Sequence, residues 1–370
     1  MTWKAVRKKA LREFTALATA IVLTASLAAC DMSSPDPKHS SASPSSSGPI
    51  AVVASIRQWG SLAEEIGGSD IALDTIVSPA SDEEAQDFEP KSADTAKLQH
   101  ASIVVTNGAG YDAWATKNLV KGTVTVSAAE TIGALEGDNP HLWLSKDVRA
   151  GMASELAEAF SKALPTKKKS FAARLQTWQA KEKTLDDEIA SFANAHGNAS
   201  YAATGTAAFY LMDDMGFKDA TPRGYSQALL AGQEPAPADL KGFRELLEGG
   251  SVALFVDTSG ESGNAKKDTK TNNGSGTGDA TNSAPGETAD AVTLLRAAAK
   301  DGAVPIVDVA TQMPAKTATL DDWIGSLIES IETALDATAP ETSGNPGSPT
   351  QGTSSPSPAQ QPASTNSSKR

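Results

Sequence analysis

One amphipathic segment constrains the fold of this chain more than any other feature. Between Thr166 and Asn194, apolar side chains recur at steps of three and four residues along an otherwise charged stretch, and only Glu182 interrupts them. The members of this stripe are Phe171, Leu175, Trp178, Leu185, Ile189 and Phe192. The spacing predicts one helix of roughly 40 Å that packs on one side only. A coiled-coil strand is the alternative, but the stripe ends within about four heptads. We therefore expect two lobes joined by one long helix.

The N-terminus carries the features of a bacterial export sequence. A basic stretch from Lys4 to Arg12 precedes an apolar run, Phe14 to Ala29, that is too short for a comfortable membrane span. The run ends in Leu-Ala-Ala-Cys30, which resembles the bacterial lipobox. We expect residues 1–29 to be a signal peptide and Cys30, the single cysteine, to be the site of lipid attachment. An uncleaved anchor with an incidental cysteine is the alternative. Lipidation would hold the protein on the outer face of the cytoplasmic membrane.

Three stretches rich in Ser, Thr, Pro, Gly and Asn are predicted to be unstructured. They are a tether over 30–48, an insertion over 258–286 and a tail over 337–370. What remains of the 370 residues is still long for a single core. The sequence thus predicts an N-terminal lobe over 49–164, the linking helix over 165–196 and a C-terminal lobe over 197–336.

Both lobes show apolar strands that alternate with helices. In the first lobe we expect strands at 50–55, 71–77, 102–106 and 123–127, and helices at 58–66, 93–101, 111–119 and 146–164. In the second we expect strands at 201–204, 251–256 and 304–309, and helices at 206–215, 238–248, 287–301 and 320–336. This alternation predicts the α/β class: two Rossmann-like lobes, each a mostly parallel sheet flanked by helices. In such sheets ligands bind beyond the carboxyl ends of the strands, so the loops 78–90, 107–110 and 139–144 are the first places to examine.

Several segments, in order, resemble a known receptor family. VVASIRQWGSLAEEIGG resembles its first strand and helix, DFEPKSADTAKLQHASIVVTNGAGYDAW its first metal-loop region, NPHLWLS its "DPHVWLDP" motif and QEPAPADL its "EPSPADL" entry into the second lobe. The family is that of the solute-binding lipoproteins of the zinc and manganese ABC importers, and the likeness covers about residues 50–335. It implies a monomeric receptor that holds a divalent metal ion, Zn²⁺ or Mn²⁺, between two lobes and delivers it to an ABC permease.

The ligand set that the resemblance implies is only partly present. The family usually holds its metal with three histidines and one carboxylate, and His141 matches one of those histidines. Gln86 stands near the place of another, Gly205 occupies the place of the third, and Asp308 is the candidate carboxylate, although strict spacing points to Ala310. The remaining histidines have poor claims: His39 lies in the tether, His100 in a helix and His196 at the end of the long helix.

Three explanations follow from this incomplete set. In the first, the site is rebuilt around His141 with oxygens from Gln86, Asp87, Asp257 and Asp308, which would favour a harder cation such as Mn²⁺. In the second, metal binding is lost and the protein is an adhesin or assembly factor of the envelope. In the third, the ligand is a chelated metal or a small polar molecule. Equally, His141 could serve only to bond a backbone carbonyl, and Asp257 only to solvate the mouth of the insertion.

Other function classes receive little support. The formal charge of −13 disfavours binding to nucleic acid. The catalytic motifs G-x-S-x-G, H-E-x-x-H and G-x-x-x-x-G-K-[ST] do not occur, and His141 has no second histidine to act with. We therefore expect a binding protein rather than an enzyme. The acidic loop from Asp82 to Glu84 could capture cations or simply remain solvated.

Overall fold

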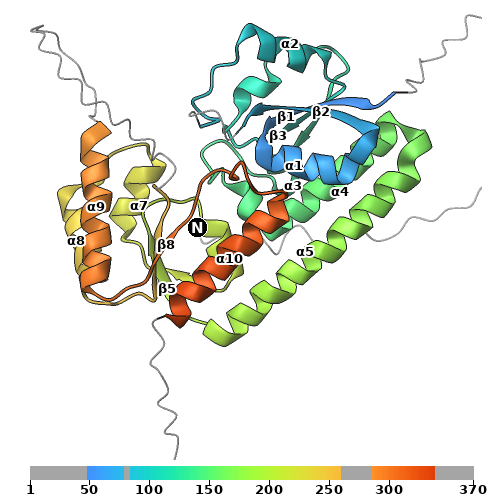
Figure 1. Cartoon of the computed structure of the whole chain (residues 1–370). Coiled ribbons are helices and arrows are strands. Elements are labelled where there is room, and N and C mark those ends of the chain that lie inside the picture. Colours follow the sequence, from blue (N-terminus) through green and yellow to red (C-terminus); the bar gives the residue numbers. More distant parts are fainter. Residues whose placement is uncertain (1–47, 79–83, 260–284, 338–370) are drawn as a thin grey trace, which may run out of the picture. The chain divides into compact units, whose positions relative to one another are not determined.

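The computed structural model describes residues 48–78, 84–259 and 285–337, with the backbone alone for 285–290 (Figure 1). All of them belong to one compact unit. The expected signal peptide, Cys30, most of the tether, the central part of the insertion, Asp82 and the tail lie outside the described residues. None of the described helices is long and apolar enough to cross a membrane.

The first sheet has four parallel strands in the order β2-β1-β3-β4. These are β1 (Ile50–Ile56), β2 (Ile71–Val77), β3 (Ile103–Thr106) and β4 (Val124–Ser127). The helical elements of this half are α1 (Arg57–Gly67), η2 (Gly68–Asp70), α2 (Ser92–His100), η3 (Ala113–Thr116), α3 (Ala128–Ile132), η4 (Leu142–Leu144) and α4 (Lys146–Ala163). β1 and β3 are almost wholly buried, as apolar strands covered by helices should be.

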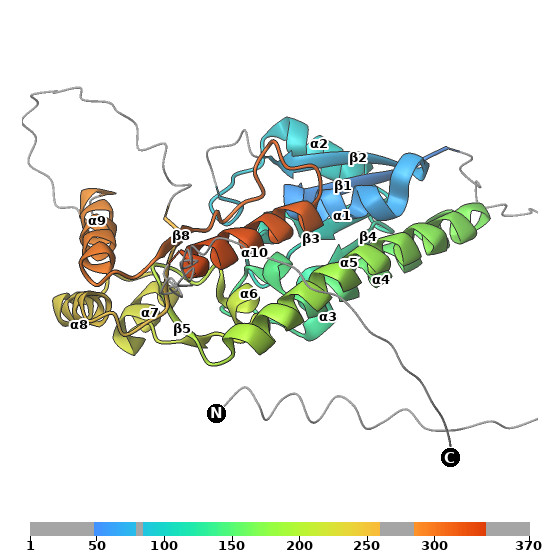
Figure 2. The same cartoon turned by 60° about the horizontal axis from the view of Figure 1, so that its bottom comes forward.

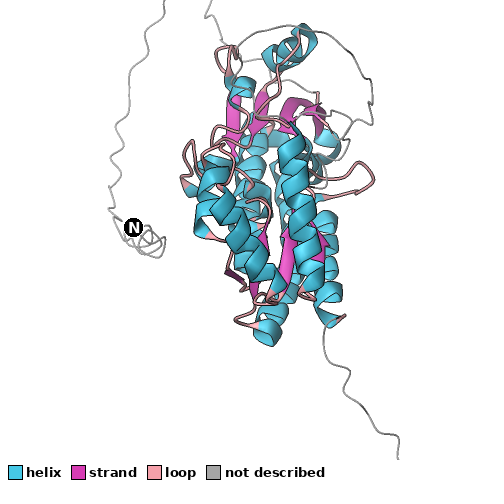
Figure 3. Cartoon of the chain, turned by 90° about the vertical axis from the view of Figure 1, so that its left-hand side faces the viewer, coloured by secondary structure: helices cyan, strands magenta, loops and turns pink. Residues whose placement is uncertain are grey.

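The second sheet repeats this plan with the order β6-β5-β7-β8, again all parallel. Its strands are β5 (Ser200–Ala203), β6 (Lys218–Asp219), β7 (Leu254–Asp257) and β8 (Ile306–Asp308). Its helices are α6 (Phe209–Asp214), α7 (Arg223–Leu230), α8 (Pro237–Glu248), α9 (Pro285–Asp301) and α10 (Leu320–Asp336). Figure 3 shows helices flanking the strands of both sheets, which confirms the predicted fold class.

The predicted long helix is α5 (Lys168–His196), which follows the short turn η5 (Pro165–Lys167). The stripe behaves as expected: five of its apolar side chains are buried, and Leu175 is partly buried. Helix α10 packs along α5 and buries its own apolar face (Figure 2). The interrupting residue, Glu182, is also buried, because it pairs with Arg149 of α4.

The predicted helix over 111–119 is wrong. Only the short turn η3 forms there, because the buried carboxylate of Asp112 accepts hydrogen bonds from the backbone N–H groups of Asn107 (2.6 Å) and Gly108 (2.9 Å) and from the Ser55 hydroxyl. These bonds fold the loop back on itself. Asn118 then takes a left-handed backbone conformation at φ 65°, which ends any helical turn.

Apart from short 3-10 turns, three elements are absent from the sequence-based prediction. These are β6, α3 and α7. They are short, and the two residues of β6 are exposed, so hydrophobic periodicity carries little information about them.

Candidate functional site

Two groups of polar side chains stand at the ends of the strands. We call the first the histidine cluster: Glu84, Tyr111, Asn139 and His141, from the loops of the first lobe. We call the second the arginine cluster: Thr204, Asp257, Ser259, Arg296 and Asp308, from the second lobe. Together they contain three of the five side chains predicted for a rebuilt metal site, His141, Asp257 and Asp308.

In the histidine cluster, Asn139 fixes the orientation of His141. The Asn139 Oδ1 lies 2.7 Å from His141 Nδ1 and also accepts the His141 backbone N–H at 3.1 Å. Its Nδ2 donates to the Thr206 carbonyl at 2.8 Å, which fixes which atom of the amide is oxygen. Since an amide oxygen only accepts, Nδ1 carries the proton and Nε2 keeps its lone pair. Burial lowers the pKa of His141 to about 4, so the ring is neutral at pH 7.

Two aromatic rings lie against His141, which is half-buried. The ring of Trp143 lies 5.3 Å away, edge-on, and that of Tyr111 lies 6.4 Å away. The Tyr111 hydroxyl donates to Glu84 Oε2 at 3.3 Å, and Glu84 Oε1 accepts from the Thr311 hydroxyl at 2.8 Å. Glu84 thus links the loop after β2 to the segment after β8. A neutral imidazole whose Nδ1–H is held by a hydrogen bond is the form in which histidine binds metals.

Gln86 does not join this cluster in the structure. It is exposed on a turn in which the Asp87 backbone N–H donates to the Glu84 carbonyl at 3.1 Å. Buried Ala85 anchors the turn, since its carbonyl accepts from Trp114 Nε1 at 2.7 Å. Gln86 and Asp87 therefore face solvent.

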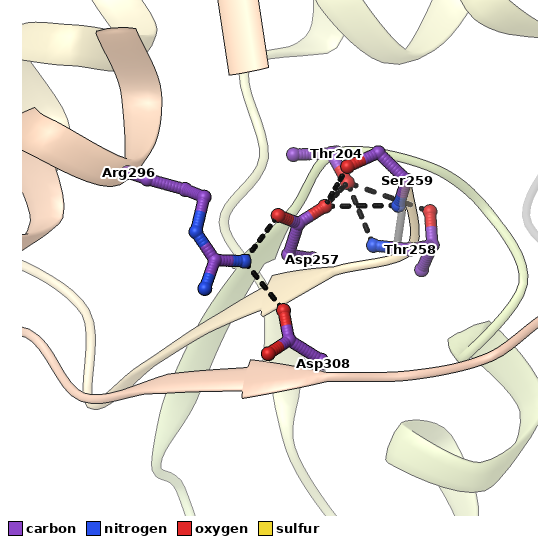
Figure 4. Close-up of polar contacts among 6 residues, drawn as sticks. All are labelled: Thr204, Asp257, Thr258, Ser259, Arg296 and Asp308. Carbon is purple, nitrogen blue, oxygen red and sulfur yellow. Dashed lines mark hydrogen bonds and ion pairs between the residues drawn. The ribbon is translucent and has the colours of Figure 1, made fainter. Parts of the chain in front are cut away.

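In the arginine cluster, Asp257 and Asp308 are brought together but a guanidinium lies between them (Figure 4). They are register partners at the ends of β7 and β8. Arg296 Nη1 lies 2.5 Å from Asp257 Oδ2 and also contacts Asp308 Oδ1. Asp257 Oδ1 accepts three further bonds, from the Thr204 hydroxyl (3.1 Å) and from the N–H (2.9 Å) and hydroxyl (2.6 Å) of Ser259. Although burial alone would raise it, the donated bonds of Ser259, Arg296 and Thr204 hold the pKa of Asp257 below its ordinary value.

Gly205, at the place of a third histidine, is closed to a side chain. A β-carbon there would overlap the Thr258 hydroxyl oxygen. Thr258 is held in place because its backbone N–H donates to Thr204 Oγ1 at 2.8 Å. The first two residues of the predicted insertion, Thr258 and Ser259, therefore belong to this network.

Within the described residues, no group of three or more His, Cys, Asp or Glu side chains is arranged to hold a metal ion. His100 and His196 are exposed, and His196 stacks on Phe192 with 4.5 Å between the ring centroids. The three-histidine set is thus not rebuilt from other residues in this part of the chain.

A cavity of about 280 Å³ lies beside the histidine cluster. Asn139 and the loop before it form one side. Strand β5, the loop to α6 with the start of that helix, the end of β6 and helix α7 form the rest. Asp138 and Asp219 are the charged residues in its described lining, and Phe209 and Leu230 are exposed apolar side chains of that lining.

Sequence reasoning named His141, Asp257 and Asp308 but not their contact residues Arg296, Asn139 and Tyr111. Arg296 lies in the apolar run LLRAAA of a predicted helix, where an isolated arginine among apolar residues could have indicated a buried ion-pair partner. Asn139 lies two residues before His141 and opens the motif NPHLWLS, but nothing in that motif indicated a role for its side chain.

Comparison with known proteins decides the family. The model of the family "ZnuA: Zinc-uptake complex component A periplasmic" matches residues 52–301, more than half of the chain. The chain belongs to this family. It is a family of extracytoplasmic substrate-binding receptors, not of enzymes, and the resemblance inferred from the sequence is confirmed.

Two relatives of this ZnuA-family chain share about a quarter of their aligned residues with it. A putative metal-binding protein of Treponema pallidum is 27% identical over 190 residues, which cover 45% of this chain and 59% of the relative. The iron-binding protein YfeA of Yersinia pestis is 25% identical over 170 residues, covering 43% and 54%. The chain thus spans less than two thirds of either relative's length.

Among solved structures, the periplasmic zinc-binding protein TroA of Treponema pallidum superposes with a TM-score of 0.59. It is 19% identical, and the match covers 78% of this chain and 99% of TroA. At this identity the match establishes the shared two-lobe fold.

Proposed function

We propose that this ZnuA-family protein is a lipid-anchored receptor that captures a divalent cation, with His141 as its imidazole ligand, and delivers it to an ABC permease. The observation that carries the proposal is the Asn139–His141 hydrogen bond of 2.7 Å. It places the proton on Nδ1 of His141, so the lone pair of Nε2 is the one that can bind a metal. Metal-binding histidines are oriented in this manner by a partner on the second nitrogen.

The relatives support a metal as the ligand but differ in which one. TroA is named for zinc and YfeA for iron. In this proposal Glu84 and Tyr111 would add oxygens to the nitrogen of His141, a set that favours a harder ion such as Mn²⁺ over Zn²⁺. The lipid anchor on Cys30, the tether and delivery to a permease belong to the same proposal.

Polar contacts between the halves of the chain support delivery with little lobe movement. Besides the Asn139 and Glu84 contacts, Tyr210 donates to the Asn139 carbonyl at 3.1 Å, and Arg57 Nη2 donates to the Thr317 carbonyl at 2.8 Å. Release of the ion would then follow a shift of the loops that carry Glu84 and His141.

Thermal unfolding and calorimetric titration with Mn²⁺ and Zn²⁺ test this proposal. A ligand that binds only the folded state raises the unfolding midpoint by mass action. We expect a shift in the unaltered protein, its loss in His141→Ala, and its retention in His100→Ala, a control at an exposed histidine. Absence of binding in the unaltered protein would contradict the proposal.

A second candidate is a small organic ligand, and the cavity favours it. Its described lining combines two carboxylates, Asp138 and Asp219, with the apolar surfaces of Phe209 and Leu230 and contains no basic side chain. Such a lining suits a small cation with an apolar part. Titration with benzylamine tests it: binding that is weakened by Asp219→Asn supports this candidate, and no binding up to millimolar concentration counts against it.

A further inference from the structure

The most telling feature outside the histidine cluster is the guanidinium of Arg296. Asp257 and Asp308 are adjacent register partners at the ends of two parallel strands, so their carboxylates meet at the edge where receptors of this architecture bind ligands. Two neighbouring carboxylates repel each other, and a cation between them offsets that repulsion. Arg296, from α9, is that cation, and one nitrogen, Nη1, contacts both carboxylates (Figure 4).

The hydrogen bonds leave Asp257 little capacity for another ligand. Its Oδ1 accepts three bonds, one from Thr204 and two from Ser259, and its Oδ2 accepts one from Arg296. A carboxylate oxygen has about two lone pairs, so Oδ1 is fully used and Asp257 keeps one position, on Oδ2. Its side chain is only 2% exposed. Asp308, by contrast, is 63% exposed and holds Arg296 as its ion-pair partner.

We propose that Arg296 is the resident cation of the second lobe, which occupies the Asp257–Asp308 pair and closes it to divalent metal ions. Arg296 thereby determines the specificity of the receptor: the second lobe contributes no carboxylate to the captured ion, and binding falls to the histidine cluster. The inference rests on the proposed function for the kind of ligand, but it concerns a different set of residues.

Removal of the guanidinium should open the pair. In Arg296→Gln, two neighbouring carboxylates remain, an oxygen-rich pair of the kind that Mn²⁺ prefers. We expect the Kd for Mn²⁺ to fall by about tenfold or more, equivalent to about 1.4 kcal/mol. The gain should persist in the double variant with His141→Ala and disappear when Asp308→Asn is added.

Arg244→Gln is the matched control. Arg244 also pairs with a carboxylate, Glu248 at 2.9 Å, but on the exposed face of α8. It carries the same change of charge, so an equal gain in this variant would show a general effect of net charge and would overturn the inference.

The outcomes separate this inference from the proposed function. Loss of binding in His141→Ala concerns the histidine cluster alone, whereas a gain in the double variant concerns Arg296 alone. A folded Arg296→Gln protein with unchanged Mn²⁺ affinity would overturn the inference. If this variant does not fold, Arg296→Met decides, because methionine keeps an apolar stem and removes the charge. We expect a similar gain in Mn²⁺ affinity, and an affinity equal to that of the unaltered protein would overturn the inference.

Discussion

Arg149 of α4 and Glu182 of α5 form a buried ion pair, with 2.6 Å between Arg149 Nη2 and Glu182 Oε1. Arg149 Nε lies 3.0 Å from the same oxygen, and its Nη1 donates to the Trp143 carbonyl at 3.3 Å. The side chains are 0% and 5% exposed. This pair explains why a charged residue interrupts the apolar stripe of the long helix, and it connects that helix to η4, directly after His141.

Breaking this pair should be costly. Glu182→Ala leaves the Arg149 charge buried and unpaired, so we expect the free energy of unfolding to fall by about 3 to 5 kcal/mol. Replacing both partners with apolar residues, Arg149→Met with Glu182→Leu, should recover most of that loss, because no buried charge remains. Urea unfolding of the unaltered protein and of these two variants measures the change. A double variant as unstable as Glu182→Ala would show that the pair itself, rather than the unpaired charge, supplies the stability.

The stability of the fold should depend on pH through Asp321. Both oxygens of this carboxyl are buried without a hydrogen-bond partner among the described residues, and burial, with the nearby charges of Glu182 and Glu65, raises its pKa to about 7. Between about pH 4 and pH 7, Asp321 is therefore protonated in the folded state and ionised in the unfolded chain, where its pKa is 3.8. The contribution of Asp321 is fully present below about pH 4 and is lost as the pH rises through about 7.

We expect Asp321→Asn to remove this dependence and to stabilise the protein by about 2 kcal/mol at pH 8. Asp187→Asn, at an exposed carboxylate paired with Lys183, is the control and should leave the slope unchanged. Unfolding midpoints measured from pH 4 to pH 8 test this prediction. If stability still falls with rising pH in Asp321→Asn, another group is responsible for the dependence.

A side chain at Gly205 should conflict with Thr258. Because a β-carbon there would overlap the Thr258 hydroxyl oxygen, we expect Gly205→Ala to cost about 1 to 3 kcal/mol. In a Thr258→Ala background the same substitution should cost less than half as much, since the hydroxyl is absent. Thermal unfolding of the unaltered protein, the two single variants and the double variant gives the coupling energy between positions 205 and 258. Equal costs in both backgrounds would show that Thr258 does not restrict position 205.

The polar segment after β7 should be dispensable for folding, on the evidence of its composition. We expect replacement of residues 260–284 with a short Gly-Ser linker to leave unfolding cooperative and Mn²⁺ binding unchanged. Thr258 and Ser259 must be kept, because they bond Thr204 and Asp257. Circular dichroism measures the unfolding transition. Loss of its cooperativity would show that the fold requires this segment.

Much of the fold was accessible from the sequence because periodicity and burial are local properties. The stripe of α5 predicts which of its faces is buried, and the apolar runs of β1, β3 and β7 predict buried parallel strands. The helix predicted over 111–119 failed because Asp112 binds backbone groups five and four residues earlier, a contact that no periodicity encodes.

The sequence by itself determined the two-lobe α/β plan, the single candidate imidazole at His141 and the placement of Asp257 and Asp308 at strand ends, since these follow from residue type and hydrophobic pattern. Only the tertiary structure decided what these groups contact. Arg296 is 39 residues from Asp257, and Asn139 reaches Thr206 across 67 residues. Whether a carboxylate is available to a metal depends on which donors surround it, and those donors come from segments that only folding brings together.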